Sequence, residues 1–101
     1  MQPINLKPNE LEIVRAILAA HVPDRKVWAF GSRVTGTDKE FADLDLTILG
    51  EEPLPAAVAA DLAEAFSESD LPFKVDVVDW ATTGDSFRRI IEKNHLVLQK
   101  P

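Results

Sequence analysis

Three aspartates have the spacing that could bind a divalent cation: Asp43, Asp45 and Asp76. Asp43 and Asp45 are separated by one residue in DLDLTILG, a segment that begins with alternating polar and apolar side chains. In a strand this spacing places both carboxylates on one face, where they repel each other and raise each other's pKa. Mg²⁺ binds one or two carboxylates and completes its shell with water and phosphate oxygens. For the pair alone, an ordinary strand end with exposed acids is an equally good interpretation.

The third carboxylate comes from the segment KVDVVDW, in which two aspartates differ in strand parity. Val75 and Val77 are expected to face the helices. Asp76 then points to the opposite side of the sheet, the side of the first two aspartates. Asp79 shares the parity of the valines at the end of the strand, so we interpret it as a cap or loop residue. Asp76 is therefore the better third acid.

A glycine and a serine, Gly31 and Ser32, end the preceding apolar segment KVWAFG. Glycine allows the backbone to come close to a ligand, and a serine hydroxyl with the N–H groups of the following turn can cradle phosphate oxygens. Alone, a Gly-Ser pair is a common turn. Ten residues separate Ser32 from Asp43, which allows a short helical turn and a return to a neighbouring strand. Phosphate donors and metal ligands would then face one crevice.

The elements that must position these residues alternate along the chain. Apolar spacing and proline or glycine boundaries predict helices over 8–21, 56–66 and 84–95. Apolar and alternating runs predict strands over 26–31, 43–50 and 73–80, and a final short strand over 96–99. This order predicts an α+β fold in which helices pack on one face of a small sheet. The aspartates lie on the other face, which has too few apolar residues to be covered by this chain alone.

Composition restricts the class of protein. The chain has 101 residues, of which 46% are hydrophobic and 28% charged, as in a single globular domain. Its net charge of −6 argues against direct nucleic-acid binding, although a metal can carry a nucleotide to an acidic site. There is no cysteine, which excludes a disulfide or a cysteine zinc site. No apolar run suits a signal peptide or a membrane span, so a cytoplasmic location is expected.

The segment GSRVTGTDKEFADLDL resembles the GSx₁₀DxD signature of the DNA polymerase β-like nucleotidyltransferase superfamily. Nearly the whole chain is similar to the core of that superfamily. The closest resemblance is to the minimal nucleotidyltransferases (MNT domains), small prokaryotic domains typically encoded beside a helical HEPN-domain protein, as antitoxin beside toxin. The resemblance implies an α+β fold with a small mixed β-sheet and helices packed on one face. It also implies one minimal nucleotidyltransferase domain over residues 1–101.

The resemblance assigns roles to the acids. Asp43 and Asp45 would bind Mg²⁺. Asp76 would help to bind the catalytic metal and would take the proton from the attacking hydroxyl. Two metal ions are expected, because such pairs stabilise both the attacking and the departing oxygen of an in-line displacement.

The resemblance also assigns the nucleotide-binding turn. Gly31 and Ser32 would hold the nucleoside triphosphate, and Arg33 and Gly36 fit the family's usual Gly-Ser-Arg-x-x-Gly pattern. The sequence departs from that pattern at Val34 and Thr35, where Ala and Arg are frequent, and at Ala42, where Ser is frequent. These departures leave every metal ligand in place and concern the contacts to the nucleotide.

The reaction implied by the resemblance is Mg²⁺-dependent transfer of AMP from ATP to a hydroxyl side chain, such as a tyrosine, of a partner HEPN toxin. The domain would be an enzyme and an antitoxin, with no membrane partner and with homo- or hetero-oligomers open. Two alternatives remain: an antitoxin that neutralises the toxin only by binding it, and nucleotidyl transfer to a small molecule. Three intact acids favour catalysis, because pure binding needs none of them. Transfer to a small molecule usually requires a second domain to hold the acceptor.

Large and basic side chains elsewhere have more ordinary interpretations. Trp28 is expected in the core. Trp80 could stack on a base or contribute to a partner surface, and core filling is at least as good an interpretation. Arg88, Arg89 and Lys93 form a basic patch on the last predicted helix, which we interpret mainly as a solvated face.

Overall fold

The computed structural model describes residues 4–36 and 42–101. Its four strands form one sheet in the order β3-β2-β1-β4. The strands are β1 (Val27–Phe30), β2 (Leu44–Ile48), β3 (Val75–Asp79) and β4 (His95–Gln99). β1 pairs antiparallel with β2 and with β4, whereas β2 and β3 pair parallel, so the sheet is mixed as expected.

Helices occupy the connections between these strands. They are α1 (Pro8–His21), α2 (Ser32–Thr35), α3 (Ala56–Ser67), the 3₁₀ helix η1 (Trp80–Thr82) and α4 (Asp85–Lys93). The short helix α2 is the predicted helical turn between Ser32 and Asp43. α3 connects the parallel strands β2 and β3, a connection that requires a crossover. Within the described residues, the structure has no helix whose length and apolar content would let it cross a membrane.

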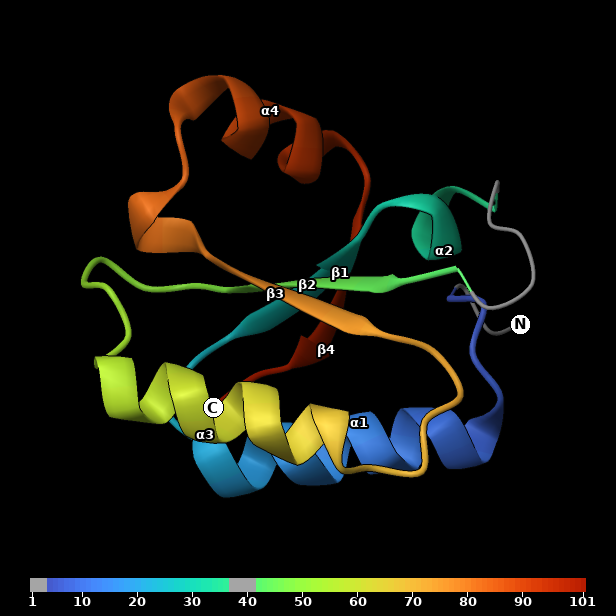
Figure 1. The fold of residues 1–101 in the computed structure, drawn as a ribbon. Helices are drawn as coiled ribbons and strands as arrows, with labels where there is room; N and C mark the ends of the chain where they lie inside the picture. Colours follow the sequence, from blue (N-terminus) through green and yellow to red (C-terminus); the bar gives the residue numbers. More distant parts are fainter. Residues whose placement is uncertain (1–3, 37–41) are drawn as a thin grey trace.

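The main core lies between the sheet and the helices α1 and α3, which pack side by side on one face (Figure 1). Alternation along β2 directs Leu44, Leu46 and Ile48 to this face, as predicted, and all three are fully buried. The helices and β1 contribute further buried residues: Val14, Leu18, Val27, Ala29, Leu62 and Phe66. Burial of a side chain of this size stabilises the fold by about 1.5–3 kcal/mol, so this face holds the sheet in register.

The opposite face of the sheet is not bare, which corrects one expectation. The α+β class is confirmed, and α1 and α3 share one face, but α4 lies across the other face (Figure 1). Val27 and Ala29 of β1 point to the main core, so that Trp28 and Phe30 point to the aspartate face. These two aromatic rings add apolar surface to a face that was expected to have too little of it. Ile91 of α4 is buried against this surface.

Aromatic stacking anchors both ends of α4. The ring of Trp28, expected in the core, is half-buried, stacks on His95 with 3.8 Å between centroids, and meets the Trp80 ring edge-on at 5.4 Å. The Arg88 guanidinium lies 4.9 Å from the Trp80 ring centroid and donates a 2.7 Å hydrogen bond to the Trp80 carbonyl oxygen. Arg88 therefore ties α4 to η1, whereas Arg89 is exposed as predicted.

Arg33 ties the turn after β1 to two distant segments. Its side chain is 7% exposed, and its guanidinium lies 4.1 Å from the centroid of the Phe73 ring. Arg33 Nε donates to the Ala42 carbonyl oxygen at 2.9 Å, and Nη1 donates to the Asn5 carbonyl oxygen at 2.8 Å. The side chain thus supports the turn from behind, and a contact between Arg33 and the nucleotide stays a prediction.

Replacing Arg33 with alanine tests this role. The Arg33→Ala variant should lose about 2–4 kcal/mol of unfolding free energy, because two partly buried hydrogen bonds from a charged donor and the packing of a buried side chain are lost. The exposed Arg89→Ala variant is the matched control and should change stability by less than about 0.5 kcal/mol. Urea denaturation followed by circular dichroism measures both. Equal stability of the two variants would show that Arg33 does not hold these segments together.

Candidate active site

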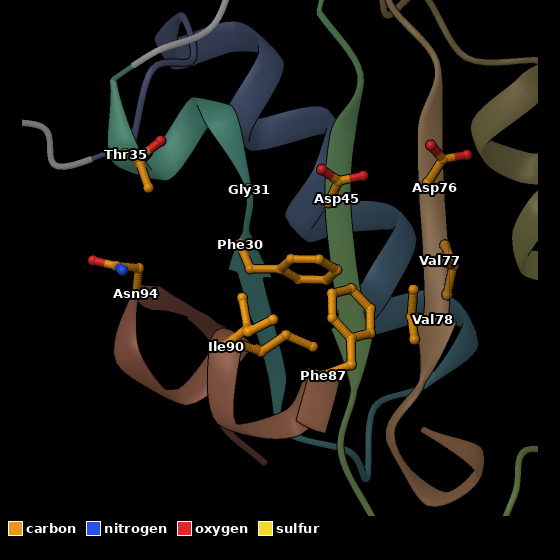
Figure 2. Close-up of a pocket in the computed structure, with 11 residues that line it drawn as sticks. Phe30, Gly31, Thr35, Asp45, Asp76, Val77, Val78, Phe87, Ile90 and Asn94 are labelled. Carbon is orange, nitrogen blue, oxygen red and sulfur yellow. The ribbon is translucent and has the colours of Figure 1, made fainter. Parts of the chain in front are cut away.

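A cavity of about 660 Å³ lies between α4 and the aspartate face of the sheet. Asp45 and Asp76 mark one end of it, beside the turn at Gly31 (Figure 2). The Phe87 ring and Ile90 form the other end, and the Phe30 ring lies between this end and the acids. This volume is in the range of small-molecule sites, about 300–1,000 Å³, and the cavity joins a charged end to an apolar end.

Strand register brings two of the three predicted acids together. Asp45 and Asp76 are directly paired positions on the parallel strands β2 and β3, and both carboxylates point to the cavity side of the sheet (Figure 2). Lys74 Nζ lies 3.7 Å from a carboxylate oxygen of Asp76, but the Lys74 side chain is 75% exposed. An ion pair this exposed contributes little, so the two carboxylates keep a net negative charge.

Burial and the close pairing of the two carboxylates disfavour the ionised form of Asp45. Burial raises the pKa of Asp45, and the charges of Asp76 and Asp43 raise it further. Asp43 is exposed just before β2 and does not line the cavity, although its charge reaches Asp45. The site therefore holds a carboxylate whose ionised form is disfavoured, and a cation beside it would relieve that penalty.

Gly31 lies directly against this carboxylate. Its φ is +84°, in the region that favours glycine. A side-chain Cβ at Gly31 would collide with the carboxylate of Asp45, whose Cγ would be only 3.2 Å away. The glycine at the end of β1 is thus required both for its backbone conformation and for the space that Asp45 occupies.

The other residues predicted for the turn lie around the cavity rather than in it. Ser32 is half-buried at the start of α2, and Gly36 ends α2 with φ +82°. Neither is among the residues that line the cavity, and Arg33 is directed away. Asp79 is a cap, as predicted: its carboxylate accepts from the backbone N–H of Leu54 at 2.8 Å and of Ala81 at 3.2 Å.

Sequence reasoning missed the apolar end of the cavity. Phe30 and Phe87 meet edge-to-face, with 5.6 Å between ring centroids. The alternation of β1 could have placed Phe30 beside Asp45, because the two are paired across the strands. No local signal distinguishes Phe87 from a residue that faces an ordinary core.

The acids fit Mg²⁺ as a pair. Among the residues that the structure describes, no cluster of three or more His, Asp or Glu side chains is arranged to hold a metal by protein ligands alone. Mg²⁺ does not require such a cluster, since it commonly uses one or two carboxylates with water and phosphate oxygens. Asp45 and Asp76, adjacent and short of positive charge, match this donor set, and Asp43 lies close enough to add its charge.

Comparison with known proteins identifies the fold family. The family model described as "Polymerase beta, Nucleotidyltransferase" matches residues 12–101. The chain belongs to this nucleotidyltransferase family. A curated relative, "Probable protein adenylyltransferase MntA" of Haemophilus influenzae, is 55% identical to this nucleotidyltransferase over 97 residues, which cover 96% of this chain and 85% of the relative.

Solved structures show the same nucleotidyltransferase fold. A toxin–antitoxin crystal structure with AMP-PNP matches with a TM-score of 0.75 and 22% identity, over 90% of this chain and 73% of that one. A structure of a tri-AMPylated Shewanella oneidensis HEPN toxin in complex with an MNT antitoxin matches with a TM-score of 0.64 and 18% identity, over 90% and 73% of the two chains. At these identities the likeness establishes the shared fold.

A pair of glycine variants tests the contact between Gly31 and Asp45. Gly36→Ala forces alanine into the left-handed region at φ +82°, ψ +15°, which costs about 1–2 kcal/mol. Gly31→Ala forces it into φ +84°, ψ −160°, a region essentially restricted to glycine, which costs about 1–3 kcal/mol. Only Gly31→Ala also displaces a carboxylate, because a Cβ at Gly36 meets nothing within 4 Å. Gly31→Ala should therefore lose about 1–3 kcal/mol more unfolding free energy than Gly36→Ala. Urea denaturation provides the comparison, and equal losses would contradict the close approach.

Replacing Asp45 with asparagine tests the electrostatic cost. Because the pKa of Asp45 is raised on folding, its charged form lowers stability above the folded-state pKa. The penalty fades as pH falls through that pKa and is absent below the unfolded-state value. In metal-free buffer near neutral pH, Asp45→Asn should therefore melt at a higher temperature than the wild type, and the difference should shrink with acidification.

Mg²⁺ provides the second half of this test. Addition of Mg²⁺ should raise the melting temperature of the wild type more than that of Asp45→Asn, because a bound ion stabilises the folded state. The exposed Asp61→Asn variant of α3 is the control and should respond to Mg²⁺ as the wild type does. A lower melting temperature for Asp45→Asn in metal-free buffer would show that the carboxylate stabilises the fold.

Proposed function

We propose that this chain transfers AMP from ATP to a hydroxyl side chain of a HEPN-domain toxin, with pyrophosphate leaving, and so acts as its antitoxin. The observation that carries the proposal is the pair of adjacent carboxylates, Asp45 and Asp76, beside the glycine turn in one cavity. The 55% identity to a probable protein adenylyltransferase supports protein as the acceptor. The AMPylated HEPN toxin in one structural neighbour supports the choice of partner.

The acids have distinct roles in this proposal. Asp45 and Asp76 would hold Mg²⁺ together with phosphate oxygens, and Asp43 would join them as a ligand from the edge of the site once the nucleotide is bound. Two ions are expected for a transfer of this type. When bound, Mg²⁺ offsets the negative charge of the phosphates and stabilises the attacking and departing oxygens. Asp76, whose side chain is 43% exposed, accepts the proton of the acceptor hydroxyl. Asp45, more confined by Gly31, supplies a fixed negative charge for the metal.

The turn after β1 holds the triphosphate in this proposal. Gly31 lets the backbone come close to the phosphates, and the hydroxyl of Ser32 adds a donor at the start of α2. Arg33 keeps this turn in place through its bonds to Asn5 and Ala42.

The charged pair favours catalysis over binding alone. An antitoxin that only covers its toxin gains nothing from Asp45, whose ionised form is disfavoured in the folded chain. Proteins commonly retain such a cost where a functional site requires it. The binding-only role is accordingly an outcome of the following test rather than a second proposal.

Label transfer tests the proposal directly. ATP labelled at the α-phosphate is incubated with Mg²⁺, the purified chain and the HEPN-domain protein of the same organism. The HEPN protein should become labelled. Asp76→Asn should reduce the rate at least about 100-fold, as expected for loss of a general base, and the double variant Asp43→Asn, Asp45→Asn should abolish labelling. Asp61→Asn should label at the wild-type rate.

The other outcomes separate the alternatives. If the HEPN protein co-purifies with the wild type but gains no label, the chain is a binding antitoxin and the catalytic proposal is wrong. A parallel reaction also contains the small-molecule fraction of the cell lysate. If label appears there only on a small molecule, the acceptor assignment is wrong while nucleotidyl transfer stands.

A further inference from the structure

The apolar end of the cavity has no role in the chemistry described so far. Phe87 of α4 is 41% exposed and Ile90 is 62% exposed, although both side chains point into the cavity under their own helix (Figure 2). The Phe87 ring meets the Phe30 ring edge-on, with an interplanar angle of 82°. An aromatic surface of this kind, left open beside a polar site, suits a planar apolar ligand group.

We propose that Phe87, supported by Phe30, is the subsite that stacks on the base of the donor nucleotide. This inference rests on the proposed function, because it names where one part of the proposed substrate lies. The cavity is continuous from Gly31 and the two carboxylates to the aromatic end. A nucleoside triphosphate has the same order of parts, with anionic phosphates at one end and a flat ring at the other.

The exposure of the carboxylate end distinguishes the donor base from the acceptor side chain. Asp43 is exposed, and the side chain of Asp76 is 43% exposed. An acceptor that belongs to another folded protein can reach the acids from this open end without passing beneath α4. The base, which is covalently joined to the phosphates, is the group that remains to fill the space under α4.

Trp80, the other aromatic residue considered for base stacking, already packs against protein groups. Trp80 does not line the cavity. Its ring contacts the guanidinium of Arg88 at 4.9 Å and the ring of Trp28 at 5.4 Å. The sequence suggested that Trp80 could stack on a base. In the structure Phe87 of α4, which lines the cavity, is the better candidate for that contact.

Equilibrium binding without any acceptor tests the inference. The ligands are α,β-methylene ATP, which cannot be cleaved at the transferred phosphate, and tripolyphosphate, which has no base, both with saturating Mg²⁺. Phe87→Ala should weaken binding of the nucleotide about ten-fold, since a base–aromatic stack is worth about 1–3 kcal/mol, and should leave tripolyphosphate binding within about two-fold of the wild type. Phe87→Tyr, which keeps the ring, should bind the nucleotide as the wild type does. Val97→Ala removes an equally exposed apolar side chain, 41%, outside the cavity, and should change neither affinity.

Each contrary result has one meaning. If Phe87→Ala binds the nucleotide like the wild type but raises the KM for the HEPN protein in the transfer assay, the ring contacts the acceptor and the inference is wrong. An equal loss for both ligands would mean that Phe87 shapes the phosphate end instead, and would also overturn it. If the wild type binds neither ligand, the proposed function itself fails.

Discussion

The parallel register of β2 and β3 is the constraint on which the rest of the structure depends. It places Asp45 directly beside Asp76 on one face and Leu46 beside Val77 on the other. A slip of one residue would exchange the two faces, burying carboxylates against α1 and α3 and exposing leucines. Burial on the core side therefore enforces a charge arrangement on the cavity side that is unfavourable by itself. The hydrophobic effect on one face offsets electrostatic repulsion on the other.

The turn after β1 completes the site, because it places Gly31 beside the paired carboxylates. Gly31 lies so close to the carboxylate of Asp45 that any residue with a Cβ at this position would collide with it. The turn is held in place by Arg33, which reaches carbonyl oxygens before α1 and just before β2. The close approach of Gly31 to Asp45 is thus supported by a buried side chain that does not touch the cavity. Such outer support is how precise polar sites are kept in position.

Sequence reasoning succeeded where the signal is local or periodic. The helix bounds Pro8–His21 agree with the structure, and strand parity correctly separated Asp76, on the cavity face, from Asp79, a cap. It failed where the outcome depends on which elements meet. The run KVWAFG reads as uniformly buried, so it did not reveal that Trp28 and Phe30 face away from the main core.

The role of Arg33 was equally hidden. It rests on bonds to carbonyl oxygens 28 and 9 residues away along the chain. Backbone carbonyl groups are identical at every position, so no residue type marks those partners. A motif places such a residue near a ligand, and only the fold shows whether its side chain points toward the ligand or away from it.

The connection from β3 to β4 joins the two outer strands of the sheet, and it must therefore span the whole cavity face. Its helix α4 buries a single residue fully, Ile91, and is also attached by the Arg88 bonds to Trp80 and by the Phe87 contact with Phe30. A helix with so little buried surface can open as a local unfolding unit. A molecule held beneath α4 contacts this bridge and the central strands at once. When the cavity is occupied, the connection from β3 to β4 and the sheet unfold together as one cooperative unit. The protection of the α4 amides against hydrogen exchange then measures the affinity of the ligand.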